Sequence, residues 1–497
     1  MSYDPKRFYE LWGEVFDLLT TEEMLRWDQE TMMPTAGHDR RGPVLSTLAG
    51  LRHRLLTAPE LCAEVAAGLE RADGLDREQF VVANREIDRA TCIPERLVQE
   101  LAAAASIGVQ SWQRARRDKN FALFAPALER IVELRREEAM IRAVGDHPYD
   151  GLLDEYEPGL RTARLTELFD RLAVDLAAMV KAAADSGVDV DESAASGSFP
   201  CEVQRAFGMW AAERIGFDFD RGRLDLSAHP FCTGLDPGDV RLTWRCNPSD
   251  FRPGLFGILH EAGHGLYEQG LPVEWRRQPL GLVRSTSVHE SQSRLWENQV
   301  GRHRGFWSFI APRFREHFPA AAKTGEEELW RAVNRVAPGP IRVDADEVTY
   351  IPHILVRFRL EVALIGGELA VADLPAAWNE GYRTLLGIDP RDDAEGVLQD
   401  IHWSTGLFGY FPTYALGSLA SAQLFAAAQR QLGDLGRRFS AGELDGLLRW
   451  MRENVHRHGC RYTADALLER ATGSPLSPEP FLEYARAKVD ALYGVTP

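Results

Sequence analysis

Two histidines and a glutamate in the run HEAGH, residues 260–264, have the types and spacing of a catalytic zinc site. His260 and His264 are four residues apart, so on a helix their Cβ atoms lie about 5–6 Å apart on one face, close enough to share one metal ion. Glu261 is rotated by about 100° from His260, which places its carboxylate beside the metal, where it can take a proton from water. The pattern predicts zinc-assisted hydrolysis with Glu261 as the general base.

A third ligand has to come from elsewhere in the chain, because a catalytic zinc usually has three protein ligands and keeps one position for water. The extended pattern HExxHxxGxxH is not met, since Tyr267 and Gly270 stand where it requires Gly and His. The next helical pattern, over 287–300, offers three candidates: His289, Glu290 and Glu297. Spacing alone leaves all three open, and a surface or supporting role is equally open for the last.

The helix that presents HEAGH is predicted to run over residues 251–270. Asp250 is placed to cap its start, and Pro253 falls in the first turn, where a missing backbone N–H costs little. Ala262 and Gly263, which lie between the two histidines, are small residues. Their size favours a metal site over two histidines that simply pack in a core.

The rest of the chain is predicted to be mostly helical. Apolar residues recur with a period of about 3.6, most clearly in segments 98–117 and 417–432, which are rich in good helix formers. Segment 240–245 instead alternates apolar and polar residues after a turn-like stretch at 234–239, which predicts one β-hairpin. The breaks between helical segments are too short to be convincing linkers between domains.

The composition indicates a folded protein with an acidic surface. The 497 residues are 45% hydrophobic and 26% charged, and 57 Lys and Arg against 74 Asp and Glu give a formal charge of −17. This charge argues against a nucleic-acid partner, because phosphate binding requires clustered cations.

The sequence also predicts a cytoplasmic protein. The six cysteines are scattered, and no pair has the short gap of a structural zinc site or a redox motif, which fits a reducing compartment. The N-terminal run MSYDPKRF leads into a charged amphipathic segment rather than the apolar core of a signal peptide. No stretch approaches about 18 uncharged apolar residues, so no membrane span is expected.

Taken together, the motifs of this chain resemble those of the M32 metallocarboxypeptidases, the thermostable carboxypeptidase Taq family. Trp27-Asp28 and Met33-Pro34 look like the family's opening segment, and the match extends to Tyr414. Six ordered motifs are far more specific than HExxH alone. These motifs are His229-Pro230-Phe231, Asp239-x-Arg241-x-Thr243, HEAGH, His289-Glu290-Ser291-Gln292, Ile341-Arg342-x-x-Ala345-Asp346 and Gly396-x-x-Gln399-Asp400-x-His402-Trp403.

The resemblance implies one mostly helical peptidase domain over residues 1–497, with two lobes around a deep groove, similar to neurolysin and angiotensin-converting enzyme. It also implies a homodimer that acts on peptides with a free C-terminus and releases single residues, with zinc as the metal and cobalt as a possible substitute. Carried over to this sequence, it makes His260, His264 and Glu290 the metal ligands. Glu261 is then the base.

Two other functions are open at this point. A dipeptidyl carboxypeptidase or an endopeptidase on the same scaffold would differ only in how the groove closes, which the sequence does not show. A non-catalytic scaffold that binds peptides and has kept the metal is disfavoured by Glu261, because binding alone needs no base beside the zinc.

An exopeptidase also needs a cation or hydrogen-bond donors for the free carboxylate of its substrate. Arg342 is the first candidate for this anchor, although it could instead pair with Asp344 or Asp346 to hold a loop. Arg241 is a weaker candidate. Because Asp239 is close in sequence, a role in holding the predicted strand is favoured, although the edge of that strand could pair with substrate backbone.

Donors for the oxyanion of the transition state are expected in segment 402–414, which contains His402, Tyr410 and Tyr414. In related helical zinc peptidases, a histidine and tyrosines downstream of the metal helix have this role. Ordinary packing is the alternative for either tyrosine. His229 is expected to pack in the core, with lining of the groove as the second interpretation.

Overall fold

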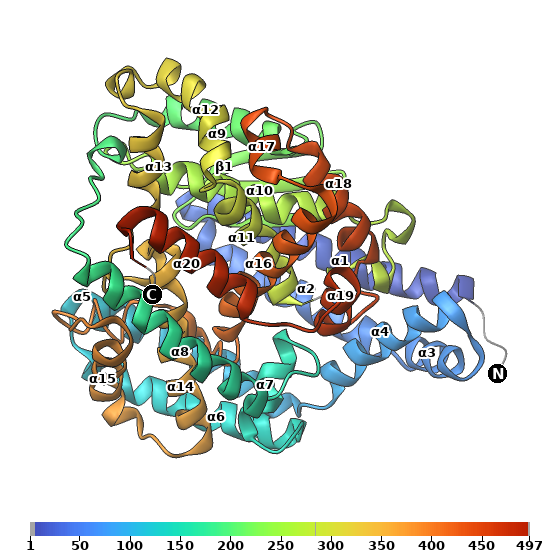
Figure 1. Ribbon diagram of the computed structural model, residues 1–497. Helices are drawn as coiled ribbons and strands as arrows, with labels where there is room; N and C mark the ends of the chain where they lie inside the picture. Colours follow the sequence, from blue (N-terminus) through green and yellow to red (C-terminus); the bar gives the residue numbers. More distant parts are fainter. Residues whose placement is uncertain (1–4, 284, 496–497) are drawn as a thin grey trace. The chain divides into compact units, whose positions relative to one another are not determined.

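Helices dominate the protein in a computed structural model, which describes residues 5–283 and 285–495 (Figure 1). The two segments with the clearest helical period lie in α5 (Glu95–Asp118) and α16 (Pro412–Leu432). α5 buries Leu97, Ala104 and Trp112, which recur at the spacing of one helix face. The prediction of a mostly helical fold is confirmed.

The chain forms two compact units, and each unit is assembled from three separate segments of the sequence. Unit 1 contains Met1–Thr91, Asp191–Val333 and Leu424–Leu476. Unit 2 contains Cys92–Val190, Asn334–Gln423 and Ser477–Pro497. The two lobes around a groove that the family resemblance implies stay a prediction.

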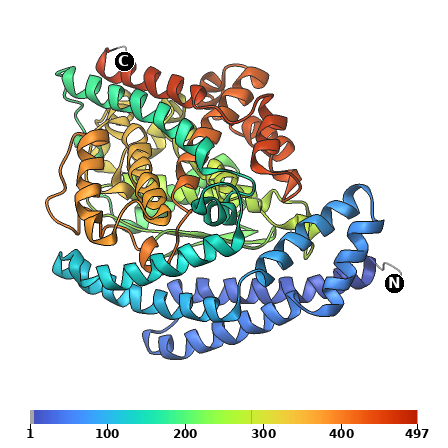
Figure 2. The ribbon, with the colours of Figure 1, turned by 90° about the horizontal axis from the view of Figure 1, so that it is seen from below.

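Unit 1 consists of helices and one small sheet. Its first four helices pack in pairs, α1 with α2 and α3 with α4, and are the blue helices of Figure 2. The HEAGH motif lies on α10, which packs against α9, α11 and the sheet. The helices are α1 (Pro5–Thr31), α2 (His38–Leu56), α3 (Pro59–Arg71), α4 (Gly74–Thr91), α9 (Cys201–Ile215), α10 (Arg252–Gln269), α11 (Thr286–Arg294), α12 (Arg304–His317), α13 (Glu326–Asn334), α17 (Leu435–Ser440), α18 (Asp445–Asn454) and α19 (Ala464–Thr472).

The described part of unit 2 contains helices and no strand, and α14 is largely buried. The side chain of Asp346 starts α14 by accepting hydrogen bonds from the backbone N–H groups of Val348 and Thr349. α14 packs against α7, α8 and α15. The helices are α5, α6 (Ala125–Arg142), α7 (Pro148–Tyr156), α8 (Thr162–Asp185), α14 (Glu347–Gly366), α15 (Leu374–Leu386), α20 (Glu479–Tyr493) and the first half of α16.

The sheet of unit 1 has three strands in the order β1-β3-β2. β2 (Cys232–Asp236) and β3 (Asp239–Trp244) form the predicted antiparallel hairpin. β1 (Gly222–Leu226) lies parallel to β3 on its other side, with Leu224 opposite Leu242. Because both edges of β3 are paired, the expectation that this strand's edge binds substrate backbone is wrong.

Within residues 5–283 and 285–495, no helix is both long enough and apolar enough to cross a membrane.

Candidate active site

Gly263 allows the two helices of the candidate metal site, α10 and α11, to come together. A Cβ atom at this position would lie 2.6 Å from the carbonyl oxygen of Gln292 and 2.7 Å from Cα of Ser293, both on α11. A residue with a side chain would therefore push the two backbones apart. The close approach places Glu290 of α11 beside the histidines of α10.

His260, His264 and Glu290 form a group whose ligand atoms all lie within 4.8 Å of one another. The Nε2 atoms of His260 and His264 are 3.6 and 3.4 Å from Oε2 of Glu290. Two imidazoles and one carboxylate are a ligand set found in catalytic zinc sites, where a fourth position stays open. These residues fit a divalent metal of the zinc type.

Arg294 restricts how Glu290 can bind a metal. Its Nε atom donates to Oε1 of Glu290 over 2.7 Å, whereas Oε2 is the oxygen that faces the histidines. The guanidinium thus occupies one carboxylate oxygen, which favours ligation through the other alone. Burial would raise the pKa of Glu290, but the charge of Arg294 holds that pKa well below its usual range.

Glu297 supports His260 through the other ring nitrogen. Its Oε2 atom lies 2.8 Å from Nδ1 of His260, which donates a proton there when Nε2 binds a metal. Arg294 donates to the same oxygen over 3.1 Å. Burial would raise the pKa of Glu297, but the charge of Arg294 and the contact with His260 lower it to about 2. Glu297 is therefore a charged acceptor behind a candidate ligand.

Glu297 reaches His260 from a π-helical segment. Residues Leu295–Val300 continue α11 with the wider turns of a π-helix. Such turns are rare and occur frequently at functional sites. The apolar period of 287–300 indicates a helix but does not distinguish these two helix types.

His289 lies behind the other histidine of HEAGH. Its Nδ1 atom is 2.5 Å from Nδ1 of His264, and its Nε2 atom is 2.9 Å from Oε1 of Glu268. His289 thus contacts a candidate ligand from behind and does not belong to the group of converging ligand atoms.

Glu261 is buried, with 5% of its surface exposed. Burial is the main cause that raises the pKa of its carboxyl group to about 7; the charge of His260 opposes this shift and that of Glu290 adds to it. A carboxylate with a pKa near neutrality can take up and release a proton at neutral pH, as a general base must.

Arg342 belongs to unit 2 and to a buried cluster with Asp400 and Arg357. Its Nε and Nη2 atoms donate to Oδ1 of Asp400 over 3.1 and 2.8 Å, and Nε of Arg357 donates to Oδ2 over 2.7 Å. Burial would raise the pKa of Asp400, but the two guanidinium groups hold it far below its usual range. The partner of Arg342 is thus Asp400, not Asp344 or Asp346.

His402, Tyr410 and Tyr414 lie together in unit 2. The Nε2 atom of His402 is 3.4 Å from the hydroxyl oxygen of Tyr414, and the rings of the two tyrosines meet edge to face with centroids 5.3 Å apart. The guanidinium carbon of Arg342 lies 5.0 Å from the ring centre of Tyr414. Burial lowers the pKa of His402 to about 4. Its ring is therefore neutral at neutral pH.

Glu361 of α14, which is fully buried, holds the segment that carries these rings. Its carboxylate accepts hydrogen bonds from the hydroxyl of Tyr149 over 2.6 Å, Nε1 of Trp403 over 2.7 Å and the backbone N–H of Gly409 over 3.0 Å. These donors join α7 and the segment after residue 402 to α14. No motif marks Glu361, because its partners come from distant parts of the sequence.

The side chain of Arg241 contacts two other side chains of unit 1, those of Asp239 and Trp27. It donates to Asp239 through Nε and Nη2, each over 2.9 Å, and its guanidinium carbon lies 4.4 Å from the ring centre of Trp27. A guanidinium at this distance from an indole ring makes a cation–π contact. These contacts agree with the interpretation that Arg241 holds the strand.

His229 lies in the loop between β1 and β2 and is exposed. Its backbone carbonyl accepts a hydrogen bond from Oγ of Ser227 over 2.6 Å. This bond holds the backbone of the loop without burying the ring. The expected packing of His229 in the core is therefore wrong, and lining of a groove stays a prediction.

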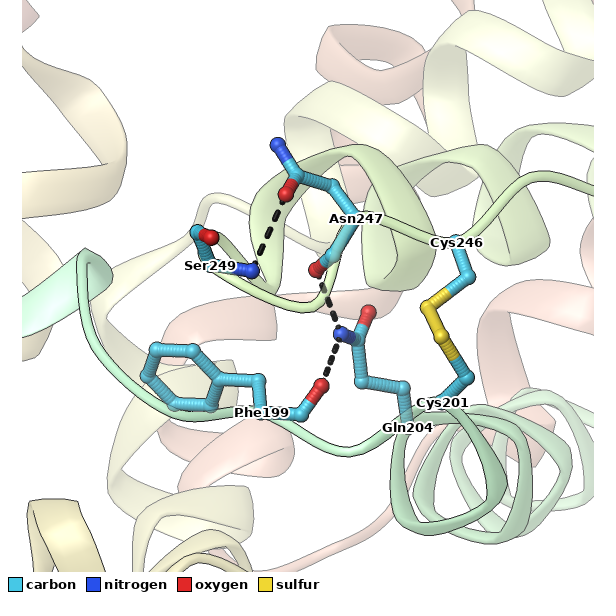
Figure 3. The surroundings of a disulfide bond; sticks show 6 residues. All are labelled: Phe199, Cys201, Gln204, Cys246, Asn247 and Ser249. Atoms are coloured by element: carbon cyan, nitrogen blue, oxygen red, sulfur yellow. Dashed lines mark hydrogen bonds between the residues drawn. A yellow bond between two sulfur atoms is a disulfide. The ribbon is translucent and has the colours of Figure 1, made fainter.

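A disulfide joins Cys201, the first residue of α9, to Cys246, in the loop between β3 and α10 (Figure 3). Beside it, Nε2 of Gln204 donates to the backbone carbonyls of Phe199 and Asn247, each over 2.7 Å. The segment that leads into the metal helix is thus tied to α9. The two cysteines are 45 residues apart, so no spacing motif reveals them. Their pairing weighs against a reducing compartment.

Nearly the whole chain matches one family of peptidases. The family model described as carboxypeptidase Taq (M32) metallopeptidase covers residues 7–489. The chain belongs to the M32 family. This M32 chain is 44% identical over 486 residues to thermostable carboxypeptidase 1 of Thermus thermophilus, and the match covers 94% of each chain. It is 35% identical over 492 residues to carboxypeptidase 1 of Bacillus subtilis, which covers 98% of each.

The fold of the M32 chain matches solved M32 structures. An M32 carboxypeptidase from Deinococcus radiodurans superimposes with a TM-score of 0.96 and 38% identity, over 99% of both chains. Metallocarboxypeptidase 1 of Trypanosoma cruzi superimposes with a TM-score of 0.94 and 35% sequence identity, over 98% of this chain and 99% of that one. The family and the enzyme class expected from the motifs are confirmed: the protein is a metallocarboxypeptidase, a hydrolase of peptide bonds with a metal cofactor.

Three residues lie outside every motif noted in the sequence: Arg294 and Glu268 beside the candidate metal site, and Arg357 beside Asp400. A signal exists for the first two, because each lies four residues after a candidate ligand and so on the same helix face. Arg357 has no such signal, since its partner Asp400 is 43 residues away.

Proposed function

We propose that this M32 enzyme is a zinc-dependent carboxypeptidase that removes single amino acids from the C-terminus of peptides, with cobalt as a possible substitute for zinc. The observation that carries the proposal is the convergence of His260, His264 and Glu290 on one helix pair that also bears the buried Glu261. Nitrogen and carboxylate ligands of this kind are those that zinc takes in hydrolytic enzymes.

Glu261 is the general base in this proposal. Zinc held by the three ligands supplies Lewis acidity, which polarises the scissile carbonyl and lowers the pKa of water from 15.7 to about 7. Glu261 takes the proton of the attacking water and delivers it to the nitrogen of the leaving amino acid. A pKa of about 7, raised chiefly by burial, suits both transfers.

Arg342 binds the terminal carboxylate of the substrate in this proposal. Its cluster contains two guanidinium groups and the single carboxylate of Asp400, so an anionic ligand meets a surplus of positive charge. The alternative is a dipeptidyl carboxypeptidase or an endopeptidase, in which the free C-terminus is recognised further from the scissile bond or not at all.

His402, Tyr410 and Tyr414 serve as donors to the oxygen that becomes negative in the transition state. Each tyrosine has a hydroxyl donor, and a neutral His402 has one ring N–H. Donors held in place before the reaction stabilise such an oxyanion without reorganisation.

We also propose a homodimer, which the family resemblance implies, and a cytoplasmic location. Sedimentation of the purified protein tests the first, with a mass of twice 55.7 kDa as the expected result. Cell fractionation tests the second, against which the Cys201–Cys246 disulfide weighs.

The deciding experiment compares one peptide with a free C-terminus and the same peptide with an amidated C-terminus. The zinc-loaded enzyme should release single amino acids in order from the free end and leave the amidated peptide largely intact. A chelator should stop the release, and added zinc should restore it. Release of dipeptides or internal fragments would favour the alternative.

A further inference from the structure

We propose that His289 and Glu268 are positioning residues that fix the tautomer and the orientation of His264 for metal binding. The inference rests on the proposed metal site and assigns a role to two side chains outside the ligand set.

The three side chains form a continuous chain of hydrogen bonds. The Nδ1 atoms of His264 and His289 are 2.5 Å apart, with ring centroids 4.4 Å apart and ring planes inclined by 27°. The ring planes are close to parallel, and the two Nδ1 atoms lie within hydrogen-bond distance of each other. The chain ends at Oε1 of Glu268, 2.9 Å from Nε2 of His289.

The direction of each hydrogen bond follows from the carboxylate at the end of the chain. Glu268, when ionised, can only accept, so Nε2 of His289 carries the proton that it shares with Glu268. A metal on Nε2 of His264 leaves the proton of that ring on Nδ1, and this N–H donates to Nδ1 of His289. The proton of His264 is thus held on Nδ1, and its Nε2 lone pair faces Oε2 of Glu290 at the metal position.

Glycine in the neighbouring strand makes room for this arrangement. A Cβ atom on Gly234 of β2 would lie 2.4 Å from the carboxyl carbon and from Oε2 of Glu268. A side chain at position 234 would therefore displace the carboxylate that anchors His289. Glu268 also lies one helical turn after His264 on α10, which sets both on one face.

The two histidines of HEAGH are supported in different ways. His260 donates directly to the carboxylate of Glu297, which Arg294 also binds. His264 is linked to the carboxylate of Glu268 through the ring of His289. The tautomer of His264 therefore depends on a residue two hydrogen bonds away from it, and this dependence can be measured.

The test measures zinc affinity of the full chain by competition with a chromophoric chelator. His289→Phe removes both ring nitrogens and should weaken zinc binding by about 10- to 100-fold. His289→Gln keeps an oxygen that can accept from His264 and should recover most of the affinity. Glu268→Gln and Gly234→Ala, which weaken or displace the anchor, should each cost up to about tenfold.

Two controls and one further measurement separate positioning from general stability. His53→Phe and Glu213→Gln, at exposed positions of unit 1, should leave the zinc affinity unchanged. The melting temperature of each metal-free variant should stay at the wild-type value. A fall in that temperature that accounts for the lost affinity, or unchanged affinity in His289→Phe, would overturn the inference. If wild-type protein binds no zinc at this site, the proposed function itself fails, which is a different result.

Discussion

Nδ1 of His260 lies 2.8 Å from Oε2 of Glu297, and this carboxylate is presented by a π-helical segment rather than an α-helix. The hydrogen bond keeps the ring proton on Nδ1 and leaves Nε2 free for a metal. Arg294 donates to Glu297 and also to Glu290. One guanidinium therefore holds the candidate ligand Glu290 and also Glu297, the carboxylate that supports the candidate ligand His260.

Replacement of Glu297 by Gln should weaken zinc binding. Gln keeps the size of the side chain but loses the charge that pairs with His260 and Arg294, and we expect a loss of about 10- to 100-fold in affinity. Chelator competition measures it. Glu213→Gln, an exposed carboxylate on α9, is the control. Equal affinities in the two variants would show that Glu297 does not support the metal site.

Replacement of Glu261 by Gln should preserve the metal and abolish most of the turnover. Gln cannot accept the proton of the attacking water, and removal of a general base typically costs about 10²- to 10⁴-fold in rate. Metal analysis of the purified variant and kcat on an unblocked peptide are the two measurements. Turnover at the wild-type rate with bound zinc would remove Glu261 as the base.

Replacement of Gly263 by Ala should disturb the contact between α10 and α11. The new methyl group would overlap the carbonyl oxygen of Gln292 at 2.6 Å, and we expect a destabilisation of about 1–3 kcal/mol together with weaker zinc binding. Gly257→Ala is a matched control on the same helix, because a Cβ there meets no atom within 4 Å. The control should be neutral, or more stable by up to about 1 kcal/mol, in thermal unfolding.

Replacement of Arg342 by Ala should impair trimming of free C-termini. Loss of charged hydrogen bonds to the substrate carboxylate should lower kcat/KM by roughly 10- to 100-fold. Any residual cleavage of the amidated peptide should change little, since that substrate has no terminal charge. Arg359→Ala, which removes an exposed arginine paired with Asp170, is the control. The same loss on both peptides would eliminate Arg342 as the anchor.

His402 should stay neutral down to acidic pH. Burial lowers its pKa from 6.5 to about 4, so the unfolded chain binds more protons than the folded one between these values. The contribution of His402 to stability is therefore complete above about pH 6.5 and is lost as the pH falls toward 4. Titration of the histidine signals by NMR, with His402→Gln to assign the resonance, checks this. A midpoint near 6.5 would contradict it.

The parts of the site that could be predicted from the sequence are those whose geometry is set by local spacing. His260, Glu261 and His264 share one turn of α10, and that turn is specified by residues within the same segment. The hairpin of β2 and β3 was predictable for the same reason, because its alternation and its turn are adjacent in the chain.

The parts that could not be predicted depend on contacts between distant segments. Arg342 pairs with Asp400, which is 58 residues away. Strand β1 pairs with β3, although β2 lies between them in the sequence. Cys201 finds its partner 45 residues further along. A local sequence pattern does not identify a partner in a distant segment. Neither the central position of β3 in the sheet nor the disulfide could therefore be predicted from the sequence.

The interleaving of the two units has a consequence for how the protein is made. Unit 1 includes Leu424–Leu476 and unit 2 includes Ser477–Pro497, so neither is complete until the C-terminal part of the chain has left the ribosome. The early helices α1 to α4 can bury a core cluster among themselves, but the rest of their unit is added only when the later segments emerge, since chains usually fold from the N-terminus onward during synthesis. Nascent chains of this enzyme are therefore expected to expose the apolar surface of both units that the C-terminal segments later cover.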